Sequence, residues 1–136
     1  MDANKAKRTI LVVDDDIDFL SQMQINLKEA GFTVITAEGQ SDAEEILKTT
    51  SPDLAIVDLM MENVDGGFSL SYHIKKKNPA IPVILVTAVA SETGLEFDAK
   101  TDEERSWVKA DVFLAKPVRF EQLLREVNRL LKEKLS

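Results

Sequence analysis

Four short apolar runs recur along the chain and give the strongest structural signal. They are Ile10–Val13, Leu54–Val57, Val83–Val86 and the weaker Val112–Ala115. Each run is continuously apolar rather than alternating, which is typical of strands that are covered on both faces of a parallel sheet. A fifth run, Thr33–Ala37, alternates more clearly and predicts an edge strand. The pattern therefore predicts a parallel sheet of five strands.

Helical patterns occupy most of the intervals between these runs. The segment Asp16–Ala30 carries an apolar stripe at helical spacing, and Gly31 is a typical C-terminal stop. A capping box at Ser41–Glu44 predicts the start of a second helix, Phe68–Lys77 forms a third, and the apolar spacing from Arg119 onward predicts a last one. Strands alternating with helices through right-handed crossovers predict a doubly wound α/β domain with helices on both faces.

The composition narrows the chemistry that this chain can perform. Its 136 residues are 44% hydrophobic, which fits one domain with its own core. The absence of cysteine excludes a disulfide framework, a thiolate zinc site and a cysteine nucleophile. The one histidine, His73, excludes a multi-histidine metal site, and its place before Lys75–Lys77 predicts a solvated face.

The charge balance narrows the choice of partners. With 17 basic and 24 acidic residues the net charge is −7, which argues against direct nucleic-acid binding by this domain. No apolar run approaches the ~18 residues that a membrane span needs. The basic segment Met1–Arg8 lacks the apolar stretch of a secretion signal. We expect a cytoplasmic protein without membrane contact.

Charged and polar residues follow the predicted strands. Because the carboxyl ends of parallel strands meet at one edge of a sheet, these residues should converge there. Clustered carboxylates repel one another unless a cation joins them, and a hard divalent ion with oxygen ligands removes that conflict. Carboxylates with a metal, a hydroxyl and a lysine are the groups that phosphoryl transfer needs. The residues concerned are Asp14, Asp15, Asp16, Asp58, Thr87 and Lys116.

Four motifs at these strand ends are, in chain order, Ile10–Asp16, Ile56–Met61, Val86–Ala88 and Ala115–Pro117. In order and approximate spacing they resemble the receiver domain of two-component response regulators over nearly the whole chain. The resemblance implies a flavodoxin-like fold with five parallel strands in the order 2-1-3-4-5. It also implies that residues 1–136 form a single receiver domain.

The resemblance assigns the phosphoryl and metal chemistry to particular residues. Asp58 would be the phosphoacceptor, taking a phosphoryl group from a sensor histidine kinase or a histidine phosphotransfer protein. Asp14, Asp15 and Asp58 would hold Mg²⁺, or Mn²⁺ in its place, with the backbone carbonyl of Met60 as a further ligand. The chain would then be a regulatory phosphoacceptor whose chemistry is limited to its own phosphorylation and dephosphorylation, and not a metabolic enzyme.

The resemblance also assigns a conformational switch. Thr87 would hydrogen-bond the phosphoryl group and move toward it, and Lys116 would pair with a phosphoryl oxygen, its bond to Pro117 being cis as in the family. Phe113 stands at the position of the switch aromatic and would turn into the space that Thr87 leaves. The nearly two negative charges of a phosphoryl group would bias a surface formed by residues 88–110, the last strand and the last helix.

The sequence departs from the family pattern in three places. Glu62 stands where most relatives have proline, and the interval between Thr87 and Lys116 is several residues longer than usual, which predicts an enlarged segment at 88–110. Met60 and Val89 occupy positions where relatives often carry polar residues that orient an attacking water. Apolar side chains there predict slow dephosphorylation.

Several questions stay open at this point. One alternative is an aspartate-nucleophile phosphohydrolase of haloacid-dehalogenase type, in which Asp14 rather than Asp58 would react; another is a pseudo-receiver with a silent pocket. The chain is either a stand-alone regulator with an unknown downstream protein or part of a longer regulator with an output domain. A homodimer is possible on this evidence, and the role of Trp107 within the enlarged segment is undecided.

Overall fold

The computed structural model describes residues 8–58, 66–87, 111–116 and 118–135. It contains a five-stranded sheet in the order β2-β1-β3-β4-β5 in which every pair of neighbours is parallel. The strands are β1 (Thr9–Val13), β2 (Thr33–Ala37), β3 (Leu54–Asp58), β4 (Val83–Thr87) and β5 (Val112–Ala115). The helices are α2 (Ile17–Glu29), α3 (Gln40–Thr49), α4 (Gly66–Lys77) and α7 (Phe120–Leu135). The predicted flavodoxin-like fold class and strand order are confirmed.

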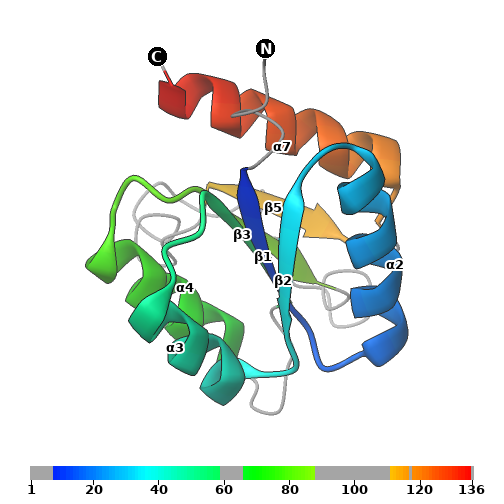
Figure 1. Ribbon diagram of the computed structural model, residues 1–136. Coiled ribbons are helices and arrows are strands. Elements are labelled where there is room, and N and C mark those ends of the chain that lie inside the picture. The colour runs from blue at the N-terminus through cyan, green and yellow to red at the C-terminus, as the bar shows by residue number, and fades with distance from the viewer. Residues whose placement is uncertain (1–7, 59–65, 88–110, 117, 136) are drawn as a thin grey trace.

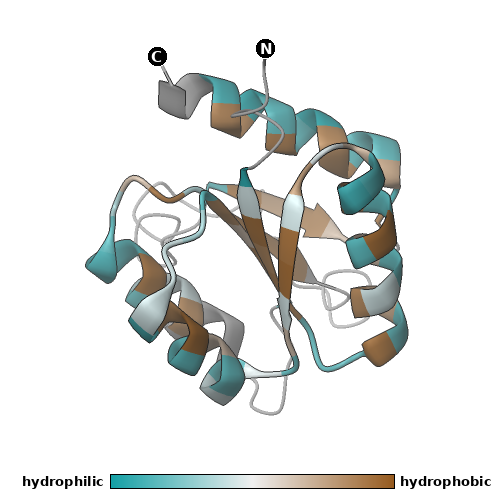
Figure 2. Cartoon of the chain, viewed as in Figure 1, coloured by the Kyte–Doolittle hydropathy of each residue, from teal (hydrophilic) through white to brown (hydrophobic). Residues whose placement is uncertain are grey.

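Two separate hydrophobic cores lie on the two faces of the sheet. In β1, Ile10 and Val12 join the core beneath α2 and α7, whereas Leu11 and Val13 join the core beneath α3 and α4. Figure 1 shows the two pairs of helices on opposite sides of the strands, and Figure 2 shows hydrophobic residues along the strands and the inward helix faces. Burial on both faces explains why the strands are continuously apolar in sequence.

Helix α2 begins and ends where local chemistry requires it. The Asp16 carboxylate caps its start by accepting hydrogen bonds from the backbone N–H groups of Asp18 (3.0 Å) and Phe19 (3.3 Å). Gly31 follows its end with a φ of +105°, a left-handed conformation that glycine adopts without steric cost. The helix predicted over Asp16–Ala30 is confirmed to within a residue at each end.

Two predicted helix starts differ from the structure. The capping box at Ser41 is wrong: α3 is capped by the extended Gly39 without a side-chain hydrogen bond, so Ser41 lies inside the helix. The Asp42 carboxylate instead accepts from the backbone N–H of Glu38, at 3.4 Å. Helix α4 begins at Gly66, two residues before the predicted start at Phe68. The cap of α3 is a glycine, which has no side chain for a sequence pattern to detect.

Two aspartates fasten strands together at the amino edge of the sheet, where the strands begin. Asp53 donates its backbone N–H to the carbonyl of Thr9 and accepts the Thr9 N–H on its carboxylate, both at 2.8 Å. Asp111 makes the same reciprocal pair with Val83, at 2.9 and 2.8 Å, and its carboxylate also binds Lys75 of α4 at 2.7 Å. We call these residues the amino-edge aspartates. By accepting these N–H groups, their carboxylates stabilise the pairing of β1 with β3 and of β4 with β5.

Candidate functional site

A second group of aspartates lies at the opposite, carboxyl edge of the sheet. Strands β1 and β3 pair with Val13 opposite Val57, so the residues that follow, Asp14 and Asp58, lie next to each other. Carboxylate oxygens of Asp14, Asp15 and Asp58 all lie within 4.8 Å of one another. Asp14 is fully buried and Asp58 is 4% exposed, whereas Asp15 is exposed. We call these three residues the acidic cluster. The structure thus brings together three of the six residues that the sequence predicted to converge at this edge.

Asp14 is held in place on every side. Its backbone N–H donates to the carbonyl of Ala37 on β2, at 3.1 Å. One carboxylate oxygen, Oδ1, accepts the backbone N–H of Asp16 at 2.9 Å, and the other, Oδ2, accepts from Lys116 Nζ at 3.0 Å. A buried carboxylate with both oxygens satisfied avoids the cost of an unpaired buried charge. Asp14 therefore forms a buried, firmly held wall of the site.

Lys116 follows β5 and reaches across the carboxyl edge to the acidic cluster. Its Nζ lies 3.0 Å from Asp14 and 3.7 Å from Asp58, although two strands separate β5 from β1. The ammonium also lies 4.8 Å from the centre of the Phe19 ring, at cation–π distance. Lys116 is therefore placed between the two buried carboxylates.

Electrostatics keeps Lys116 charged in this position. Burial by itself lowers the pKa of the Lys116 ammonium, but the hydrogen bond that it donates to Asp14 and the charges of the neighbouring aspartates outweigh burial. The net effect raises the pKa above its ordinary value. One ammonium faces the three carboxylates of the acidic cluster, so the site keeps an excess of negative charge that a cation would offset.

The acidic cluster fits a hard divalent cation. It offers carboxylate oxygens from two adjacent strand ends, two of them nearly buried and one exposed to solvent. Mg²⁺ prefers oxygen ligands, uses few carboxylates and keeps several waters, and Mn²⁺ accepts the same donors. The exposed Asp15 leaves the cluster open to solvent on one side. The three predicted carboxylate donors thus lie close enough together to share one ion.

The structure describes two of the remaining predicted site residues, Thr87 and Phe113. Thr87 ends β4 at the same carboxyl edge and pairs in register with Ala115, directly before Lys116. Phe113 is partly buried, lies opposite Leu85, and packs against the core beneath α3 and α4. The other predicted positions lie outside the described residues: Met60, Glu62, Val89, Trp107, Pro117 and the enlarged segment 88–110.

Sequence reasoning missed Phe19 as a residue of this site. The apolar stripe of helix α2 buries Leu20, Met23 and Leu27. Phe19 precedes this stripe by one position, and the Lys116 ammonium lies over its ring. The available signal was its place in the first turn after the Asp16 cap. Residues in the first turn of a helix that follows a strand-end aspartate lie at the carboxyl edge by necessity.

The fold and the acidic cluster together define a receiver-type signalling domain. Residues 10–128 match the family described as response regulator receiver domain, and the chain belongs to this family. It is 36% identical over 99 residues to the alkaline phosphatase synthesis transcriptional regulatory protein PhoP of Bacillus subtilis, which covers 68% of this chain and 40% of PhoP. It is 32% identical over 127 residues to the transcriptional regulatory protein ZraR of Salmonella typhimurium, covering 93% of this chain and 27% of ZraR.

Solved structures agree with this assignment. A CheY-like receiver domain protein from Methanospirillum hungatei superposes with a TM-score of 0.78 at 24% identity, covering 94% of this chain and 96% of that one. The response regulator TrrA from Thermotoga maritima, solved in complex with Mg²⁺–BeF, superposes with a TM-score of 0.73 at 29% identity. That match covers 90% of this chain and 98% of TrrA.

The chain spans less than two thirds of the curated relatives named above, which are transcriptional regulators. Within the part of the chain that the structure describes, no helix is both long and apolar enough to cross a membrane.

Proposed function

We propose that Asp58 is the phosphoacceptor of this receiver domain and takes its phosphoryl group from a phosphohistidine. The donor would be a sensor histidine kinase or a histidine phosphotransfer protein. The observation that carries the proposal is the convergence of the Asp58 carboxylate with Lys116 Nζ, at 3.7 Å, and with two further carboxylates within 4.8 Å. Asp58 is the carboxylate of this group that ends β3, at the edge where ligands of parallel sheets bind.

The transfer is a nucleophilic displacement at phosphorus. A carboxylate oxygen of Asp58 forms the new O–P bond while the N–P bond of the donor histidine breaks, leaving its electron pair on the imidazole nitrogen. Lys116, already charged and between Asp14 and Asp58, neutralises a phosphoryl oxygen as it arrives. The product is an aspartyl phosphate at position 58.

The acidic cluster would hold the divalent ion that the family uses. Asp14, Asp15 and Asp58 are proposed ligands of Mg²⁺ or Mn²⁺, with the backbone carbonyl of Met60 as a further one. Such an ion neutralises developing charge on the transferring phosphoryl group. The excess negative charge of the cluster and its oxygen-only donors support this assignment.

Phosphorylation would be read out through Thr87 and Phe113. The phosphoryl group adds nearly two negative charges and new acceptor oxygens, for which the Thr87 hydroxyl and Lys116 are donors. Phe113 packs only partly buried against the core beneath α3 and α4, and turning further inward would change the surface around β5 and α7. Met60 and Val89, apolar where relatives often carry polar residues, lead us to propose a long-lived phosphoryl group.

We propose a regulatory role in the cytoplasm rather than metabolic turnover. The family relationship supports a histidine kinase as upstream partner. The transcriptional regulators among its relatives support either a downstream protein or an output domain as the recipient of the signal.

The haloacid-dehalogenase alternative is disfavoured by the burial of Asp14. That mechanism requires the aspartate after the first strand to attack the substrate. Here Asp14 is 0% exposed, and its two oxygens are engaged by the Asp16 N–H and by Lys116. To attack a substrate, the Asp14 carboxylate would have to give up one of these two hydrogen bonds.

Intact mass spectrometry after incubation with acetyl phosphate tests the proposal. We expect one phosphoryl adduct that requires Mg²⁺ and is absent from Asp58→Asn. Asp53→Asn is the matched control, because Asp53 directly precedes the same strand and an asparagine oxygen can still accept the Thr9 N–H. An adduct that survives in Asp58→Asn and vanishes in Asp14→Asn would support the phosphohydrolase instead. A folded wild type that gains no adduct would indicate a pseudo-receiver.

A further inference from the structure

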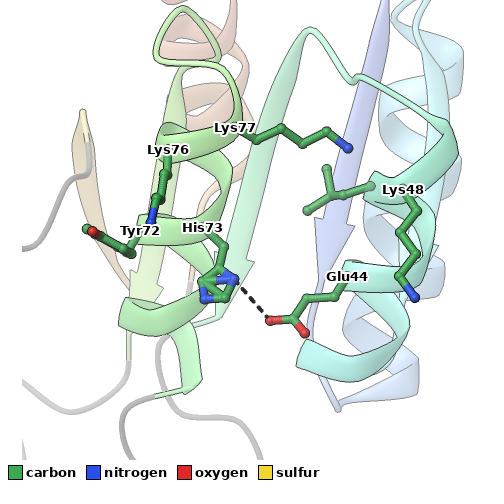
Figure 3. A pocket seen from close by; sticks show the side chains of 7 residues that line it. Glu44, Lys48, Tyr72, His73, Lys76 and Lys77 are labelled. Atoms are coloured by element: carbon green, nitrogen blue, oxygen red, sulfur yellow. Dashed lines mark ion pairs between the residues drawn. The ribbon is translucent and has the colours of Figure 1, made fainter.

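A groove between α3 and α4 lies outside the acidic cluster and its proposed chemistry. Its volume is about 380 Å³, within the range of protein binding pockets. The side chain of Leu47, 5% exposed, forms part of its lining. Figure 3 shows charged and aromatic side chains from both helices around it. Those drawn and labelled are Glu44, Lys48, Tyr72, His73, Lys76 and Lys77.

The groove is positively charged in a protein whose net charge is −7. Its carboxylate, Glu44, is already engaged: Oε2 accepts from Gln40 at 3.0 Å and lies 3.5 Å from Nδ1 of His73. Within the described residues, Lys76 and Lys77 have no carboxylate at salt-bridge distance. The groove therefore presents two ammonium groups whose charge is not neutralised by this part of the chain.

Lys48 adds a third positive charge from the facing helix. It pairs at 2.9 Å with Glu45 of its own helix, and both side chains are more than two thirds exposed (68% and 73%). An exposed pair of this kind contributes little stability and exchanges readily for a better partner. In Figure 3, Lys77 extends from α4 toward α3, where Lys48 lies, so positive charge stands on both sides of the groove.

An exposed aromatic residue adjoins these charges. Tyr72 is 47% exposed and stands edge-on to His73 with ring centres 6.3 Å apart. Lys76 Nζ lies 5.9 Å from the Tyr72 ring centre. Tyrosine is enriched in protein interfaces because it offers a large rigid surface with a polar end. The groove thus combines an apolar lining residue, an exposed ring and positive charge.

We propose that this groove docks an acidic segment of a partner protein. Carboxylates of the segment would face Lys76, Lys77 and Lys48, and an apolar side chain would pack over Leu47 and Tyr72. The ammonium groups are spread over two helices instead of converging on one point, which suits several separate carboxylates better than a single phosphate. The proposal does not depend on the chemistry of Asp58.

The proposal is tested by titrating the full chain, uniformly ¹⁵N-labelled, with a short peptide of alternating glutamate and leucine. Amide shifts should map to α3 and α4, and affinity should fall with added salt. We expect the double variant Lys76→Glu, Lys77→Glu to bind about tenfold more weakly. The control Lys28→Glu, Arg125→Glu makes the same change in net charge at exposed positions on α2 and α7. Thermal melting of both variants checks that each is folded.

Three results would overturn the proposal. Equal weakening by both double variants would mean that only net charge matters. Undiminished binding of the same peptide with glutamine in place of glutamate would mean that charge does not matter. Shifts at the same residues with ATP or anionic vesicles, but not with the peptide, would assign the groove to another class of ligand. A normal phosphoryl adduct in the Lys76→Glu, Lys77→Glu variant separates all of these from a failure of the phosphoacceptor proposal.

Discussion

The two edges of this sheet use the same residue type for different purposes. Asp53 and Asp58 stand at the two ends of β3: Asp53 precedes its first residue, and Asp58 is its last. Asp53 points its carboxylate at a backbone N–H, and Asp58 points its carboxylate toward Lys116 and two other carboxylates. A carboxylate that is matched to a backbone donor stabilises the fold. One that is crowded by like charge beside a lysine is the kind of group found at ligand-binding sites.

The lysines repeat the same contrast. Lys75 binds Asp111, whose carboxylate is already matched to the Val83 N–H. Lys116 instead lies between Asp14 and Asp58 and forms ion pairs with both. One lysine completes a strand connection, and the other holds together charges that would otherwise repel. The comparison predicts that variants at the two edges differ in kind: carboxyl-edge changes alter phosphorylation, and amino-edge changes alter stability.

The largest effect is expected from removing the Lys116 charge. Lys116→Met should slow phosphorylation by acetyl phosphate about 100-fold, because a preorganised positive group opposite the phosphoryl oxygens is lost. Its matched control, Lys75→Met at the amino edge, should phosphorylate at the wild-type rate. Single-turnover rates followed by intact mass provide the measurement. Similar rates for the two variants would contradict the functional contrast between the lysines.

The next largest effect concerns stability. Asp53→Ala and Asp111→Ala should each lower the free energy of unfolding by about 1–3 kcal/mol, because each leaves a backbone N–H of the sheet without its hydrogen-bond acceptor. Asp58→Asn should instead leave stability unchanged or raise it by about 1 kcal/mol, since it relieves repulsion at a functional site. Urea unfolding in metal-free buffer measures all three. A destabilised Asp58→Asn beside a neutral Asp53→Ala would reverse the comparison and refute it.

The smallest effect is expected at Asp16, and it tests which aspartates of the carboxyl edge are structural and which are functional. Asp16 lies at the carboxyl edge but caps α2, so its role resembles that of the amino-edge aspartates. Asp16→Ala should cost about 1 kcal/mol of stability, and Asp16→Asn much less, since asparagine caps nearly as well. Both should keep phosphorylation within about twofold of wild type. A strong loss of phosphorylation in Asp16→Asn would place Asp16 in the acidic cluster.

The sheet could be predicted from sequence because burial on both faces leaves a simple trace. Residues such as Ile10 and Leu11 point into different cores, so the whole run must be apolar. The parallel arrangement then placed Asp14, Asp58, Thr87 and Lys116 at one edge without further information. The start of α3 could not be predicted in the same way, since the side-chain pattern at Ser41 was misleading and the cap, Gly39, has no side chain.

The amino-edge aspartates and Phe19 could not be predicted because their partners are distant in sequence. Asp53 pairs with Thr9 across 44 positions, and Asp111 with Val83 across 28. Nothing near either aspartate in sequence distinguishes it from an exposed loop residue. The contact between Phe19 and Lys116 likewise depends on how β5 lies relative to α2. Such pairings follow from strand order and register, which are known only once the sheet is assembled.

Locating the phosphoryl group by chemical trapping tests the central claim most directly. Borohydride reduces an aspartyl phosphate to homoserine with loss of phosphate, and peptide sequencing by mass spectrometry then identifies the altered residue. After incubation with a phosphorylated histidine kinase and Mg²⁺, we predict homoserine at position 58 and unmodified aspartate at positions 14, 15 and 53. Homoserine at position 14, or none in a folded chain that has been mixed with the phosphorylated donor, would contradict the role given to Asp58.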